Sequence, residues 1–133
     1  MFLDTTFCID LMREEHRGIG GPAVTKLRAL GGVSLYAAVF VICELQAGAR
    51  LSRHPIQELR KVEWFADQLE IVYPDSSFAV AYGELESYLR KKGKTIPLMD
   101  LLIGVSARMR GLPLLTRDTN HFEMIPGLVV ETY

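Results

Sequence analysis

The sequence is poor in cysteine and has no long apolar run. Cys8 and Cys43 are the two cysteines among 133 residues, and neither lies in the paired Cys/His spacing of a zinc site. Two cysteines are too few for a disulfide framework, so we interpret both as reduced thiols of the core. No stretch reaches the length of a membrane span, and Asp4 interrupts the first apolar residues before a secretory signal could form. We therefore expect a soluble, cytoplasmic protein that has no membrane partner.

Net charge is also nearly absent. The chain has 15 Lys and Arg residues against 16 Asp and Glu residues, which gives a formal net charge of −1. This balance excludes a broadly basic surface, so any polyanionic partner must be held by a local patch. Apolar residues make up 49% of the sequence, which is enough for one domain spanning residues 1–133 to bury a core.

Short apolar segments alternate with segments of helical periodicity. Strands are predicted at residues 1–3, 33–36, 70–73, 112–115 and 129–131. Between them, caps and apolar repeats predict helices after residue 4 and over 22–30, 40–53, 55–69, 77–92 and 97–110. This alternation favours an α/β fold, a single domain with a central, mostly parallel sheet flanked by helices. Ligands of such open sheets bind beyond the carboxyl ends of the strands.

Four acidic residues are predicted to lie at or near that edge. Asp4 follows the first strand and caps the next helix, and Asp118 follows the strand that ends at residue 115. Asp100 lies in the first turn of a helix, where the helix dipole favours an anion. Glu44 is an isolated charge in an apolar stretch and needs a polar partner. Taken singly, each aspartate could be only a cap, a turn residue or a favoured helix start. Four acids near one edge of the sheet together indicate a functional site.

Four segments resemble the motifs of a PIN domain. They are Leu3-Asp4-Thr5-Thr6, Glu44–Gly48, Ile96–Ile103, and Leu115–Asp118 with His121-Phe122. They have the order and spacing of the VapC-type ribonuclease toxins of prokaryotic toxin–antitoxin pairs, and the likeness covers essentially the whole chain. The resemblance implies a PIN-like fold and an endoribonuclease activity. It also implies that the catalytic residues are Asp4, Glu44, Asp100 and Asp118.

Clustered carboxylates also predict a metal ion. Two carboxylates ~5 Å apart repel by roughly 3 kcal/mol at an effective dielectric of ~20, and a bound cation relieves that repulsion. Oxygen donors without paired His or Cys favour Mg²⁺, with Mn²⁺ as a substitute, over zinc. Such an ion can activate a water for hydrolysis of a phosphodiester bond. The expected direct ligands are Asp4 and Asp100, with Glu44 and Asp118 completing the site. The expected supporting polar groups are Thr5 and Thr116.

Two positions depart from the family pattern. Thr6 stands where Asn is common, and Ala38 lies in the segment where a Ser usually precedes the glutamate. Those family residues would orient Asp4 and Glu44 by hydrogen bonds. The two departures therefore bear on the hydrogen bonds that orient these acids, and hence on the rate of the reaction more than on its type.

The resemblance implies three partners: an RNA substrate, a small VapB-like antitoxin and a second copy of the chain in a homodimer. The antitoxin is expected to occlude the acids, with a basic side chain set against them. His121 is interpreted as a surface or loop residue, close enough to Asp118 to contact a phosphate. Two alternatives stay open: a PIN nuclease of RNA processing or DNA repair, and a non-catalytic PIN interaction module. Small size speaks against the first, and the intact acidic quartet against the second.

Overall fold

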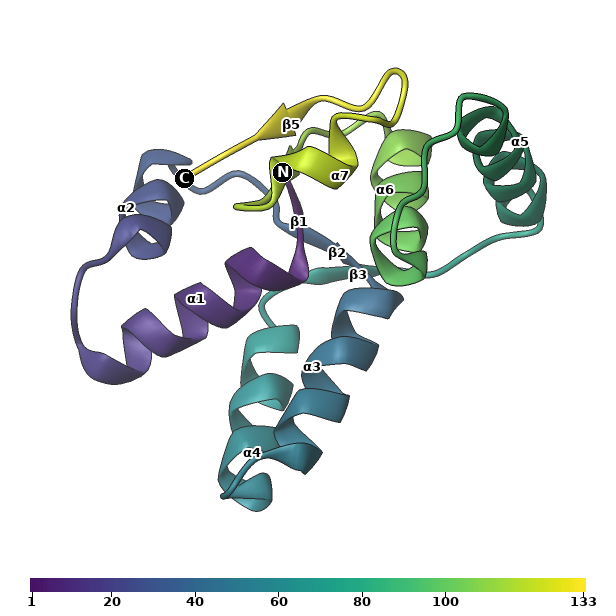
Figure 1. The fold of residues 1–133 in the computed structure, drawn as a ribbon. Coiled ribbons are helices and arrows are strands. Elements are labelled where there is room, and N and C mark those ends of the chain that lie inside the picture. The colour runs from purple at the N-terminus through teal and green to yellow at the C-terminus, as the bar shows by residue number, and fades with distance from the viewer.

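Five short strands form one sheet in the computed structural model, which describes all 133 residues (Figure 1). The strands are β1 (Phe2–Leu3), β2 (Tyr36–Ala38), β3 (Glu70–Val72), β4 (Leu114–Leu115) and β5 (Val130–Glu131). Their order across the sheet is β3-β2-β1-β4-β5, and every adjacent pair is parallel. The predicted α/β class with a mostly parallel sheet is confirmed.

Seven helices flank this sheet. They are α1 (Thr5–Arg17), α2 (Pro22–Ala29), α3 (Val39–Leu51), α4 (Pro55–Ala66), α5 (Phe78–Lys91), α6 (Leu98–Arg110) and α7 (Thr119–Phe122). Helix α3 packs against α4, and α5 packs against α6 (Figure 1). None of the seven has the length and apolar character needed to cross a membrane.

The centre of the sheet is the centre of the hydrophobic core. Phe2 and Leu3 of β1 and Leu114 and Leu115 of β4 have no exposed surface. Both central strands are buried on both faces, which explains why they are continuous apolar runs without alternating polar residues. Twenty-six buried apolar residues form one cluster around them. The site must therefore lie at the ends of the strands, because their faces are covered.

The strand predicted at residues 33–36 is displaced along the chain. The structure has β2 at Tyr36–Ala38, where Tyr36 pairs with Phe2 of β1 and Ala38 pairs with Val72 of β3. Val33 is 48% exposed in the loop instead. Pairing on both sides decided the register, and small buried alanines fit a central strand that is covered by helices, although alanine has a weak intrinsic preference for strands.

The two cysteines do not share one environment. Cys8 on α1 is buried as predicted, and burial raises the pKa of its thiol above the ordinary range, so it stays protonated. Cys43 is exposed, so its assignment to the core was wrong. Helix α3 turns Val41 and Leu45 inward, and Cys43, two residues from each, lies on another face.

The chain leaves β1 and β4 toward opposite edges of the sheet. From β1 it continues through α1 and α2 to β2, whereas from β4 it continues through α7 to β5. This arrangement is a topological switch point, and the crevice beyond the carboxyl ends of the two strands is where such sheets bind ligands. Leu3 pairs with Leu115. The next residues, Asp4 and Thr116, therefore emerge side by side at that crevice.

Candidate active site

Asp4 is the buried acid at the switch point. It is 3% exposed and is the N-cap of α1, with Oδ2 accepting a hydrogen bond from the Thr6 amide. The same oxygen accepts hydrogen bonds of 2.7 Å from the hydroxyls of Thr6 and Thr116. Three donors on one oxygen fix the carboxylate and leave its second oxygen free of protein hydrogen bonds.

Thr6 therefore supports Asp4 directly. The departure from the common Asn therefore leaves a hydrogen-bond donor to Asp4 at this position. Ala38 occupies the N-cap position of α3, and its methyl side chain makes no hydrogen bond to the helix.

Thr116 connects two of the predicted acids. Its side chain is fully buried after β4, and its hydroxyl donates to Asp4. The same hydroxyl oxygen accepts a hydrogen bond of 3.0 Å from the backbone amide of Asp118. The turn that holds Asp118 is thereby tied to the buried carboxylate.

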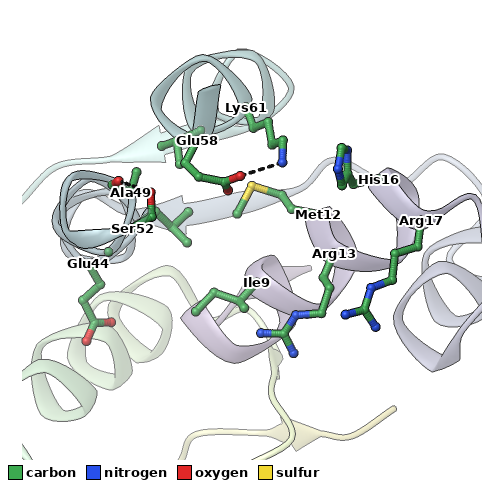
Figure 2. Close-up of a pocket in the computed structure, with 13 residues that line it drawn as sticks. Ile9, Met12, Arg13, His16, Arg17, Glu44, Ala49, Ser52, Glu58 and Lys61 are labelled. Atoms are coloured by element: carbon green, nitrogen blue, oxygen red, sulfur yellow. Dashed lines mark hydrogen bonds and ion pairs between the residues drawn. The ribbon is translucent and has the colours of Figure 1, made fainter. Parts of the chain in front are cut away.

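Glu44 reaches the site from α3. Its Oε2 accepts a hydrogen bond of 2.5 Å from the hydroxyl of Thr5, in the first turn of α1. This bond supplies the polar partner that the isolated charge required, and Thr5 has the supporting place predicted for it. Glu44 also lines a hollow of about 380 Å³ between α1, α3 and α4, which Figure 2 shows with Arg13 and Arg17 on its far wall.

Asp100 and Asp118 meet around a histidine. Asp100 lies in the first turn of α6, and its Oδ2 is 2.7 Å from Nδ1 of His121 on α7. The same ring nitrogen is 3.6 Å from Oδ2 of Asp118. The predicted site did not include His121, which the sequence indicated as a loop or surface residue. Its position three residues after Asp118, on one helical turn, was the signal that could have placed it there.

Glu44 and Asp100 respond to the charges of the neighbouring acids. Burial raises the pKa of Glu44, the bond from Thr5 lowers it, and the charges of Asp4 and Asp100 raise it further. Burial also raises the pKa of Asp100, the bond from His121 lowers it, and Asp4 and Asp118 raise it. Neighbouring negative charges therefore make Glu44 and Asp100 costlier to ionise, which is the situation that a cation relieves.

The donor set suits a hard divalent cation. No three His, Cys, Asp or Glu side chains converge closely enough to form a closed metal cage. Mg²⁺ does not require such a cage, because it keeps several waters and is commonly bound through one or two carboxylates. Two buried or half-buried aspartates from different elements, with two further acids beside them, meet that description. The roles of the individual acids stay a prediction.

Comparison with known proteins gives the same family. The profile of the family described as PIN domain matches residues 1–128. The "tRNA(fMet)-specific endonuclease VapC" of Shigella flexneri is 28% identical over 132 residues, covering 98% of this chain and 96% of the relative. Its namesake from Salmonella typhimurium is 34% identical over 92 residues, covering 69% and 70%.

Structural comparison agrees with the sequence relatives. The chain superimposes with a TM-score of 0.88 on a crystal structure of VapBC2 from Rickettsia felis bound to a DNA fragment from their promoter. The two are 28% identical, and the match covers 99% of this chain and 97% of the other. The chain therefore belongs to the PIN-domain family and, within it, to the VapC ribonucleases.

Proposed function

We propose that this protein is a metal-dependent endoribonuclease that acts as the toxin of a toxin–antitoxin pair. The observation that carries the proposal is the placement of four acids from separate elements around the switch point of the sheet, where the charge of Asp4 acts on both Glu44 and Asp100, in a chain related to VapC ribonucleases. Hydrolysis of RNA phosphodiester bonds is the reaction that such an acidic cluster serves best when a divalent ion is bound.

The proposed ion is Mg²⁺, with Mn²⁺ as a substitute, held by Asp4 and Asp100. When bound, it would supply Lewis-acid activation of a water and stabilisation of the negative charge on phosphate. Glu44 and Asp118 would complete the site directly or through ordered waters. Thr5 and Thr116 would hold the carboxylates in place by the hydrogen bonds described above.

The proposed substrate class is transfer RNA. Two relatives carry the name tRNA(fMet)-specific endonuclease, and that name supports initiator tRNA as the first substrate to test. Cleavage would be mapped on labelled initiator tRNA and on total RNA after induction of the protein in cells. Discrete fragments from one RNA class would identify the target, and intact RNA of every class would contradict the proposal.

The proposed partners are a small VapB-like antitoxin, supported by VapBC complexes among the similar structures, and a second copy of the chain. We propose that the pair acts in the cytoplasm, where the RNA substrate is present. Size-exclusion chromatography with light scattering tests the homodimer. Coexpression with the gene next to this one tests neutralisation of toxicity.

The decisive experiment is a nuclease assay with purified protein, Mg²⁺ and an EDTA control. The protein is expected to cleave RNA with Mg²⁺, to lose activity in EDTA, and to be inactive as Asp100→Asn. A folded wild-type protein that cleaves no RNA under any of these conditions would favour a non-catalytic PIN module. Cleavage by a protein that is harmless at high expression, with no neighbouring partner gene, would favour a PIN nuclease of RNA processing or DNA repair.

A further inference from the structure

Three arginines line two hollows that extend from the acidic site along α1, although the chain has almost no net charge. Arg13 and Arg17 lie one turn apart on α1 and extend side by side (Figure 2). Together with Arg117, they line a second hollow of about 330 Å³. Arg13 and Arg17 thus border both this hollow and the one that reaches Glu44. A chain with a net charge of −1 can hold a polyanion only through a local concentration of cations such as this.

We propose that Arg13, Arg17 and Arg117 form an arginine track that binds the phosphate backbone of RNA next to the acids. The inference rests on the proposed function and adds the surface that holds the substrate. A guanidinium group suits this task because its planar fork of N–H donors matches phosphate oxygens and stays charged at every physiological pH.

Arg117 joins the track to the site. It directly precedes Asp118, and its backbone amide donates a hydrogen bond of 3.4 Å to the hydroxyl of Thr6. That hydroxyl in turn binds the buried carboxylate of Asp4. RNA bound at Arg117 would therefore place its phosphate backbone next to Asp4, one of the predicted metal ligands.

A buried carboxylate positions two of the three guanidiniums. Asp10 is 8% exposed, and its oxygens lie 2.6 Å from Nη1 of Arg117 and 3.6 Å from Nη1 of Arg13. Tyr133 fixes Asp10 by donating a hydrogen bond of 3.0 Å, while its ring packs edge-on against Phe7. The side chains of Arg13 and Arg117 nevertheless stay 57% and 63% exposed. Their orientation is fixed while their outer N–H groups face solvent, which lowers the entropic cost of binding a phosphate.

The third guanidinium is unpaired. Arg17 makes no ion pair, and Glu14, the other acid of the second hollow, directs its carboxylate to the amides of Ala23 and Val24 at the start of α2. The acids around the track are thus engaged with the protein itself. Arg17 retains its full charge for a ligand.

Other basic groups are placed less well for the substrate. Arg108 and Arg110 are exposed in the last turn of α6, at the opposite end of the helix from Asp100. Eight and ten residues of helix separate them from Asp100, roughly 12–15 Å along the axis, and neither lines the hollows that Arg13 and Arg17 border. These two arginines provide the matched control, because they carry the same charge and form no ion pair.

The experiment measures RNA binding separately from cleavage. Asp100→Asn protein, in which cleavage is expected to be abolished, is titrated into a short fluorescein-labelled single-stranded RNA of mixed sequence at several salt concentrations. Arg17→Gln and the pair Arg13→Gln/Arg17→Gln are expected to lower affinity several-fold. They are also expected to reduce the slope of log affinity against log salt by about 0.7 for each phosphate that the protein no longer neutralises. In the active protein, the same changes should raise KM more than they lower kcat.

The control pair Arg108→Gln/Arg110→Gln is expected to leave the slope unchanged. Arg17→Gln keeps the test falsifiable because it breaks no ion pair of the folded protein, whereas Arg117→Gln also removes the Asp10 pair. Unchanged binding in the Arg13/Arg17 pair, or an equal loss in the control pair, would overturn the track. Normal RNA binding with weaker antitoxin binding would assign the arginines to the protein partner and would also overturn it. A wild-type protein that binds RNA through the arginines but never cleaves it would instead refute the proposed function.

Discussion

Thr116 donates a hydrogen bond of 2.7 Å to Oδ2 of Asp4, although 112 residues separate the two in the chain. The bond exists because β1 and β4 are neighbours in register, so that the residues following them emerge together. The uncharged hydroxyl of Thr116 thus holds both the most buried acid of the site and the turn before Asp118. Its removal gives the first prediction.

Replacing Thr116 by valine keeps the shape of the side chain and removes the hydroxyl. We expect nuclease activity to fall by about 10- to 100-fold, because a carboxylate without its orienting hydrogen bond binds its ion less well. The partly buried amide of Asp118 also loses its acceptor, which should cost about 1 kcal/mol in the free energy of unfolding. Urea titration and initial rates measure the two effects. Thr116→Ser should restore most of both, and full activity in the valine variant would contradict the supporting role.

Asp100→Asn should abolish cleavage without destabilising the fold. Burial and the neighbouring acids raise the pKa of Asp100, which means that its ionised form is disfavoured in the folded protein. A neutral amide removes that repulsion at neutral pH, so the melting temperature is expected to stay the same or to rise. Asp67→Asn is a suitable control, because Asp67 is exposed at the end of α4 and makes no ion pair. Retained activity in Asp100→Asn would refute its assignment as a metal ligand.

Asp4→Asn should also abolish cleavage but should lower stability. Asn is an adequate N-cap, but an amide oxygen accepts hydrogen bonds more weakly than the carboxylate that now accepts from Thr6 and Thr116. We expect a loss of about 1 kcal/mol, measured by urea titration. An increase in stability would show that the hydrogen bonds do not compensate the buried charge.

Divalent ions should stabilise the protein independently of RNA. Mg²⁺ or Mn²⁺ is expected to raise the melting temperature of EDTA-treated protein, since a ligand that binds the folded state shifts the unfolding equilibrium. The increase should vanish in Asp100→Asn and remain in Asp67→Asn. Zn²⁺ should restore little activity, because the four acids supply hard oxygen donors. Full activity in metal-free protein would contradict metal-dependent hydrolysis.

Two glycines in helices should respond to alanine with opposite signs. A Cβ on Gly104 of α6 would collide with Cδ1 of the buried Ile125 and touch the ring of Phe122, so Gly104→Ala should lower stability by about 1–3 kcal/mol. The change should also lower activity, because Ile125, which must move, lies three residues after the end of α7, the helix that carries His121. Gly83 of α5 has no neighbour in the path of a Cβ, and Gly83→Ala should raise stability by up to about 1 kcal/mol. Thermal melts of both variants test the close packing of α6 on α7.

Much of the fold was predictable because local patterns and tertiary packing agree. The strands around Phe2 and Leu114 were predicted from short apolar runs, which two buried faces require. Strand β2 was misplaced because its alanines carry little strand preference, and only pairing with β1 and β3 selected them. Cys43 was misjudged for a similar reason: an apolar helix does not reveal by itself which face its neighbours leave exposed.

The sequence by itself determined the chemical groups of the site and the ends of strands and helices at which they stand. Asp4 as a cap and Asp100 in a first helical turn follow from local backbone preferences, which act over a few residues. Tertiary structure decided which groups meet. The register of β1 and β4 brought Thr116 to Asp4, packing of α7 on α6 brought His121 to Asp100, and Asp10 turned Arg117 toward Arg13. These interactions join residues far apart in the chain, and they depend on the order of strands and the packing of helices, which no local pattern encodes.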